Sequence, residues 1–213
     1  MSDQSETRCD QPLRFSIPAL NARGRLVRLD AVLNDVMAAH AYPPAVEKIL
    51  AEALVLTALL GTTLKDREGQ LTMQAQTENG PISLLVCDYI DGAVRGYAQF
   101  DLVKLAEVPA DPNLFALFGK GYLAVTFDRP FPDAQAGARY KGIVPLEGDT
   151  RSDAAVQYFD QSEQLPTFIR VAIDHVGGRC IAGGLMVQYL PDGEVGRERL
   201  HARADHPDWE HVR

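Results

Sequence analysis

The stretch of this chain that comes nearest to a chemical site is Leu146-Glu147-Gly148-Asp149-Thr150, where two carboxylates flank a glycine. Carboxylates serve in acid–base catalysis, and a glycine loop before a helix can hold a phosphate. A phosphate loop needs several glycines and usually a lysine, as in GxxxxGK[ST], and neither is present. Two carboxylates would also repel an anion. Thr150 is instead placed to cap a helix expected over 151–163, so we interpret the segment as a structural joint.

The histidines form no catalytic or metal-binding pattern. Asp174 and His175 are neighbours on an expected strand, so their side chains point to opposite faces and cannot form a direct acid–base pair. GxSxG and HExxH motifs are absent. Histidines recur every five residues in the tail, at His201, His206 and His211. That spacing turns them by about 140° per step on a helix, which does not build a common zinc face.

The cysteines, Cys9, Cys87 and Cys180, are far apart in the sequence. No pair has the spacing of a zinc or dithiol site, and free cysteines of this kind are most often buried small apolar groups. The residues therefore predict no catalytic site, no cofactor and no metal site in this chain.

Composition and charge argue against a nucleic-acid or membrane partner. The 213 residues are 46% hydrophobic and 23% charged, and a chain of this length buries a large core without disulfides. The formal net charge of −8 is opposite to the positive field that binds phosphate backbones. The polar N-terminal sequence does not fit a secretory signal, and the most apolar run, residues 49–60, is too short to span a bilayer. We expect a cytoplasmic protein.

The hydrophobic periodicity predicts an α+β fold with a large, mainly antiparallel sheet and packed helices. Residues 14–29 predict a hairpin with its turn at 21–24, and Asp30 is placed to cap a helix that ends at Tyr42-Pro43-Pro44. Residues 45–60 predict a helix that is apolar on nearly every side, closed by Gly61. Such a helix must be central, covered by sheet or by a partner chain.

The rest of the chain is rich in predicted strands. Residues 71–100 predict a three-stranded meander. A short helix over 112–118 carries Phe115 and Phe118 at a spacing of three, and both are expected in the core. Further strands are predicted over 122–127, 140–146, 167–175 and 181–190, the last two joined at Gly177-Gly178.

Several segments resemble the redox-regulated heat-shock protein 33 holdase family. They are YKGIVPLEGDT (140–150), YFDQSEQLPTFI (158–169) and AGGLMVQYLP (182–191), with further likeness over 14–65 and 119–127. The residues that carry the resemblance are Gly142, Leu146, Glu147, Gly148, Asp149, Thr150, Ser162, Glu163, Gln164, Leu165, Pro166, Gly183 and Gly184. We expect these residues to hold the geometry of the scaffold.

The resemblance implies an ATP-independent cytoplasmic chaperone without enzymatic activity. Its partners would be unfolded or partly folded client proteins, whose aggregation it prevents during oxidative stress, and a second copy of itself in an activated homodimer. Client contacts in such proteins are diffuse, so no client-binding residue is assigned.

The resemblance also implies a redox switch in a separate C-terminal module, where four cysteines arranged as CxC and CxxC bind zinc. Oxidation would form disulfides, release the zinc and unfold the module, because metal binding supplies the folding energy of so small a unit. None of the cysteines here matches such a ligand. We therefore expect a fragment. Residues 1–190 would form the N-terminal chaperone domain and residues 191–213 the start of a charged linker or helix, with the zinc module absent from this chain.

Two other classes of protein stay open. The chain is alternatively a small-molecule enzyme with an unrecognised pocket, or a structural dimerisation domain. A cleft with convergent titratable side chains would favour the enzyme. Self-association without client binding would favour the dimerisation domain.

Overall fold

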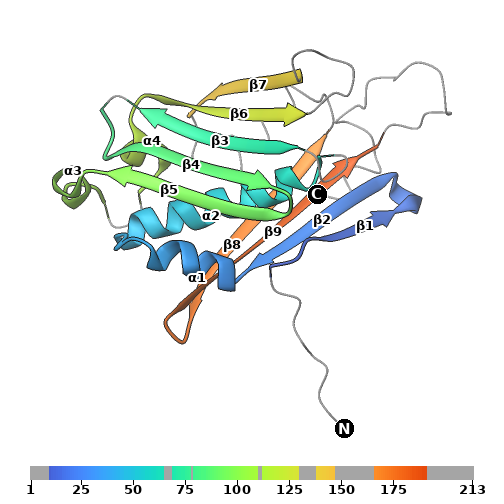
Figure 1. The fold of residues 1–213 in the computed structure, drawn as a ribbon, viewed down its shortest axis with the longest axis horizontal. Coiled ribbons are helices and arrows are strands. Elements are labelled where there is room, and N and C mark those ends of the chain that lie inside the picture. The colour runs from blue at the N-terminus through green and yellow to red at the C-terminus, as the bar shows by residue number, and fades with distance from the viewer. Residues whose placement is uncertain are drawn as a thin grey trace, which may run out of the picture.

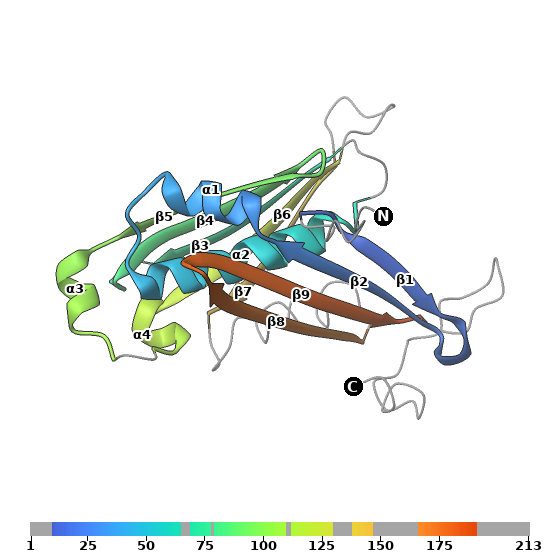
Figure 2. The same ribbon diagram turned by 90° about the horizontal axis from the view of Figure 1, so that it is seen from below.

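The computed structural model describes residues 10–64, 69–77, 79–109, 112–129, 138–146 and 166–190. Two antiparallel sheets lie on either side of a central helix, α2 (Figures 1 and 2). The helices are η1 (Pro18–Leu20), α1 (Ala31–Ala38), α2 (Pro44–Gly61), α3 (Leu102–Ala106) and α4 (Leu114–Phe118). The strands are β1 (Leu13–Ile17), β2 (Ala22–Leu29), β3 (Gln70–Thr77), β4 (Ile82–Ile90), β5 (Ala93–Phe100), β6 (Gly121–Arg129), β7 (Ala138–Pro145), β8 (Thr167–Val176) and β9 (Arg179–Tyr189).

The strands are divided between a four-stranded sheet, in the order β1-β2-β9-β8, and a five-stranded sheet, in the order β5-β4-β3-β6-β7. The predicted α+β class is confirmed, but the strands form two sheets because α2 separates them. The predicted meander is β3-β4-β5. The strands predicted over 122–127, 140–146, 167–175 and 181–190 are β6, β7, β8 and β9, which pair as β6-β7 and β8-β9.

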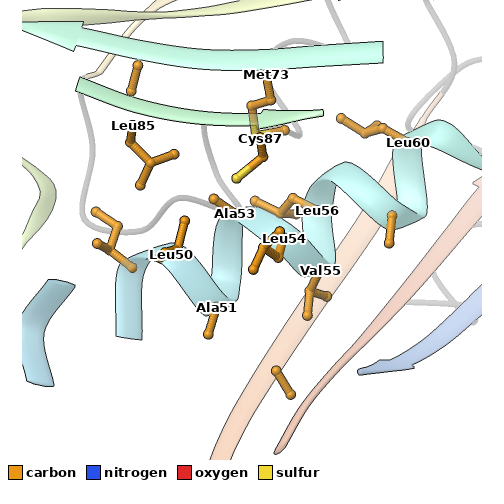
Figure 3. Close-up of a cluster of buried hydrophobic side chains, with 14 of the residues drawn as sticks. Leu50, Ala51, Ala53, Leu54, Val55, Leu56, Leu60, Met73, Leu85 and Cys87 are labelled. Atoms are coloured by element: carbon orange, nitrogen blue, oxygen red, sulfur yellow. The ribbon is translucent and has the colours of Figure 1, made fainter. Parts of the chain in front are cut away.

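The helix α2 is buried along nearly its whole length, as its sequence predicts. Leu54 is fully buried and packs closely on Gly96 of β5. A methyl group at Gly96 would lie 3.0 Å from the Leu54 side chain. Val55, the next residue, points the other way, toward β8 and β9 (Figure 3). One helix therefore supplies the core of both sheets, and each leucine buried in this way stabilises the fold by about 1.5–3 kcal/mol.

Two glycines let α2 approach the sheets closely. A methyl group at Gly61 would overlap the ring of Tyr89 on β4, and one at Gly184 would overlap Val55. The prediction that Gly61 caps the helix is wrong. The cap is Thr62, which has right-handed backbone geometry, and Gly61 is needed because an aromatic ring occupies the space of its side chain.

The first helix, α1, is capped by a residue distant in the sequence. The carboxylate of Asp10 accepts hydrogen bonds from the N–H groups of Asp30 (2.9 Å) and Ala31 (3.1 Å). The side chain of Asp30, predicted to cap this helix, makes no capping hydrogen bond, so that prediction is wrong. It instead pairs with Arg179 at the start of β9, at 2.7 Å.

The short helices α3 and α4 lie together at one end of the molecule (Figure 1). The sequence did not predict α3, whose first turn is capped by the carboxylate of Asp101. It predicted α4, in which Phe118 is buried as expected. Phe115 is 62% exposed, so its assignment to the core is wrong. The buried positions of α4 are Leu114, Leu117 and Phe118, and Phe115 lies beside that stripe.

Among the described residues, no helix combines the length and the apolar character that crossing a membrane requires.

Candidate functional site

The residues considered for catalysis do not come together. On β8, the N–H of His175 donates to the carboxylate of Asp174 (2.8 Å). The imidazole of His175 faces Glu47 instead, with Nε2 3.9 Å from Oε2. Within the described ranges, no group of three or more His, Cys, Asp or Glu side chains is placed to hold a metal ion. The tail histidines, His201, His206 and His211, lie outside those ranges.

The two described cysteines are unreactive by environment. Cys87 and Cys180 are both free and buried, as the sequence predicts for cysteines of this kind. Burial raises the pKa of each thiol above its ordinary value. Because the thiolate is the nucleophilic form, neither residue is suited to covalent chemistry at neutral pH.

The described residues among those that carry the family resemblance sit in the scaffold. Leu146 is 5% exposed, and its N–H donates to the carbonyl of Gly121 (3.1 Å). The carbonyl of Pro166 accepts from the N–H of Tyr189 (3.0 Å). Gly142 lies within β7, and Gly183 and Gly184 lie within β9. The remaining members, 147–150 and 162–165, lie outside the described residues, so the structural role of the whole set stays a prediction.

The feature best suited to binding is an apolar surface on the four-stranded sheet. Side chains of a strand alternate between its two faces, and the contact of Gly184 with Val55 identifies the face that meets α2. The alternate residues point away from α2 and are aligned in rows by the strand register. We call this set the outer apolar face. It comprises Leu13, Phe15, Ile17, Leu20, Ala22, Leu26, Phe168, Leu185, Val187 and Tyr189.

An aromatic ring covers the middle of this face. The ring of Phe15 on β1 lies over Gly24 on β2, where any side chain would overlap it. The predicted hairpin is confirmed, but Gly24 is inside β2 and not in the turn. The turn is made by η1 and Asn21, which has a left-handed φ of 45°. Glycine is therefore needed at position 24, because the ring of Phe15 occupies the space of a side chain there.

The outer apolar face is covered around Ala22, Val187 and Tyr189, which are 2%, 5% and 3% exposed, and it is open at the end that carries Leu13 and Leu26. Leu13 and Leu26 are opposite each other on β1 and β2, and they are 50% and 44% exposed. The described helices that pack on this sheet, α1 and α2, share the core on its other face (Figure 2). The guanidinium of Arg170 lies 4.5 Å from the ring centre of Phe168 and places a positive charge at the edge of the face.

Other exposed apolar side chains are less continuous. Leu102 and Val103 on α3 are 66% and 74% exposed, but that helix spans only five residues. On the outer side of the five-stranded sheet, the exposed Tyr122 and Ile143 alternate with polar groups, and the hydroxyl of Tyr122 donates to Gln76 (3.1 Å). Neither surface has apolar side chains on as many neighbouring strands as the outer apolar face.

No contact surface was predicted from the sequence, although the residues of β9 indicate one. Its residues are apolar at both alternations, with Ala182 and Met186 facing α2 and Leu185 and Val187 facing outward. A strand with only one buried face needs apolar residues at only every second position. A strand that is apolar on both sides indicates a second contact surface.

These features define a class of protein: a two-sheet α+β domain that presents an apolar sheet face. A family model described as Hsp33 protein matches residues 10–211, and this chain belongs to that family.

Relatives of known name agree with this assignment. The chain is 39% identical over 206 residues to the 33 kDa chaperonin of Caulobacter vibrioides (strain NA1000 / CB15N), covering 93% of this chain and 64% of the relative. It is 40% identical over 201 residues to the 33 kDa chaperonin of Yersinia pestis (strain Pestoides F), covering 92% and 63%. The chain therefore spans less than two thirds of the length of these curated relatives.

A solved structure has the same fold. The crystal structure of the 33 kDa chaperonin (heat shock protein 33 homolog) from Thermotoga maritima superposes with a TM-score of 0.70 at 24% sequence identity, covering 84% of this chain and 60% of that one. At that identity the likeness concerns the fold alone.

Proposed function

We propose that this chain is the client-binding part of an ATP-independent holdase chaperone. Its partners are unfolded or partly folded proteins, whose exposed apolar segments bind the outer apolar face. The observation that supports this most directly is the continuity of apolar side chains on the sheet face opposite α2. Leu13 and Leu26 are the exposed members of this face. Exposed neighbouring apolar side chains can contact a partner, and the contact needs no catalytic group.

The physical basis is the removal of apolar surface from water on both partners. Flexible aliphatic side chains at Leu13 and Leu26 adapt to different clients, since apolar contact is non-directional. A segment held on this face cannot join a growing aggregate. The proposal assigns no reaction to the chain.

Redox control belongs to the same proposal. The family resemblance implies a zinc-binding module with CxC and CxxC motifs, and the 213-residue sequence contains neither motif. We infer that residues 1–190 form the chaperone domain, that residues 191–213 begin the linker, and that zinc binds outside this chain. Homodimer formation and a cytoplasmic location are further parts of the proposal.

Light scattering of a heat-denatured model client tests the proposal. The chain should suppress aggregation at stoichiometric amounts without oxidant. Leu26→Asp, which places a charge in the outer apolar face, should lose most of this suppression. Val103→Asp is the matched control, because Val103 is 74% exposed but lies on α3, away from that face. Circular dichroism verifies that both variants are folded. Equal suppression by the two variants, or none by the wild-type chain, would contradict the proposal.

A further inference from the structure

Three arginines gather on the α2 side of the four-stranded sheet, beside the C-terminal end of that helix. Arg14 on β1 is directly opposite Arg25 on β2, and Arg23 lies two residues before Arg25 on the same face of β2. Arg23 Nε and Arg25 Nη1 both donate to Oε1 of Gln188 on β9, each at 3.3 Å. Arg14 Nη2 donates to the carbonyl of Thr62 at the end of α2 (3.2 Å). We call the three arginines and Gln188 the arginine cluster.

The described residues do not neutralise the charge of this cluster. In the described ranges, none of Arg14, Arg23 and Arg25 forms an ion pair with a carboxylate. Gln188 is a neutral acceptor, and the end of a helix supplies only about half a negative charge. Like charges placed opposite each other on neighbouring strands destabilise a sheet. The arrangement is therefore unfavourable unless an anion joins it.

Arg25 carries the clearest sign of a missing partner. Its Nε is buried and has no hydrogen-bond partner. Burial, then the charges of Arg23 and Arg14, lower the pKa of its guanidinium to about 10. A buried cationic donor without an acceptor is costly, and native proteins satisfy nearly all such groups. Arg14 and Arg23 place two further guanidinium groups on the same side of the sheet.

We propose that the arginine cluster is a binding site for an oxyanion of the phosphate class. Gln188, which is 2% exposed, holds Arg23 and Arg25 together through one oxygen and engages one nitrogen of each guanidinium. A guanidinium presents its donors as a planar fork that matches two oxygens of a phosphate. A multiply charged anion also matches several cations better than a single carboxylate does. The site lies on the opposite side of the sheet from the outer apolar face, so it stands independently of the proposed function.

Thermal unfolding in inorganic phosphate, compared with sodium chloride at matched ionic strength, tests the site. A ligand that binds only the folded chain raises Tm, by about 3–6 °C when its concentration is ten times Kd. The rise should saturate with phosphate concentration. General stabilisation by excluded salts increases without saturating, so the shape of the curve separates the two effects.

Arg25→Gln is the decisive variant, and Arg28→Gln is its control on the opposite face of the same strand. Without phosphate, Arg25→Gln should be at least as stable as the wild-type chain, because it removes repulsion among like charges. With phosphate the variant should be less stable than the wild-type chain, because it lacks the saturable rise in Tm. Arg28→Gln should keep the full phosphate response.

Two outcomes would overturn the proposal. If a carboxylate of the chain already neutralises the cluster, Arg25→Gln will be less stable than wild type in both buffers and phosphate will give no saturable gain. The proposal is also overturned if phosphate raises the Tm of the wild-type chain no more than sodium chloride does. The Nε–H resonance of Arg25, followed by NMR during phosphate titration of the wild-type chain, gives an answer even if the variant folds poorly. It should shift in a saturable way, and a resonance that does not move contradicts binding.

Discussion

The side-chain amide of Asn34 pairs with the backbone of Cys180 through both of its polar atoms. Asn34 Nδ2 donates to the carbonyl of Cys180 (2.8 Å), and the N–H of Cys180 donates to Asn34 Oδ1 (3.1 Å). The strand β2 ends at Leu29, opposite Ala182, so Asn34 continues the hydrogen bonding along β9 where β2 stops. With the nearby pair of Asp30 and Arg179, this contact fastens α1 to the β8-β9 hairpin.

Replacing Asn34 should therefore destabilise the fold. Asn34→Ala leaves the N–H and C=O of Cys180, which is 3% exposed, without these partners. We expect the free energy of unfolding to fall by about 2–3 kcal/mol, measured by urea denaturation. Asp35→Ala, an exposed change on the same helix, should stay within about 0.5 kcal/mol of wild type. Equal effects of the two variants would show that the Asn34 contact contributes nothing.

The adjacent glycines of β9 provide a matched test of the scaffold role expected for the residues that carry the family resemblance. A methyl group at Gly184 would overlap Val55 and crowd Leu59, whereas at Gly183 the nearest atom, the carbonyl oxygen of Val27, is 3.5 Å away. We expect Gly184→Ala to cost about 1–3 kcal/mol of unfolding free energy through overpacking, and Gly183→Ala to cost much less.

A second substitution checks that mechanism. Val55→Ala removes the methyl group that a side chain at position 184 would overlap. In denaturant titrations the double variant should be more stable than the sum of the two single changes predicts. Strictly additive effects would mean that the contact between α2 and β9 is not what requires glycine.

The cysteine on β4 should make stability depend on alkaline pH. Burial raises the pKa of Cys87 above its ordinary value of 9.0, while a hydrogen bond with Thr57 partly opposes this. Above pH 9 the unfolded chain loses the thiol proton and the folded chain keeps it. The folded state then binds more protons, so its stability is complete below that pH and falls as the pH rises further.

This dependence is measured by denaturant titration at a series of pH values. The thiol contributes a slope of up to about 1.4 kcal/mol per pH unit above the unfolded pKa. Cys87→Ala should be less stable than wild type at neutral pH, and it should lose that part of the slope. A variant with an unchanged alkaline slope would contradict the assignment.

Much of the fold is predictable because local patterns decide it. The run from Ala45 to Leu60 is apolar on nearly every side, and only a helix enclosed by other elements satisfies that pattern. The turn at Gly177-Gly178 was also predicted, and both glycines have left-handed backbone geometry there. Such features depend on neighbours in the sequence alone.

The parts that were missed depend on residues distant in the sequence. Asp10 caps α1 from twenty residues away, and the ring of Tyr89 decides the role of Gly61. The division into two sheets follows from how the strands arrange around α2, which periodicity does not encode. The same holds for the outer apolar face, since its rows form only when β1, β2, β8 and β9 come together. The segment 147–150, with which the sequence analysis began, lies outside the described residues, and its capping role stays a prediction.

The central claim is that clients bind the outer apolar face, and site-specific photo-crosslinking tests it most directly. A photoreactive side chain is placed at Leu26, or at Val103 as the control, and each protein is irradiated with a client during heat denaturation. We predict strong crosslinks from position 26 to the unfolding client, weak ones from position 103, and none to the native client. Crosslinks that are as strong from position 103, or absent from position 26 while aggregation is still suppressed, would contradict the claim.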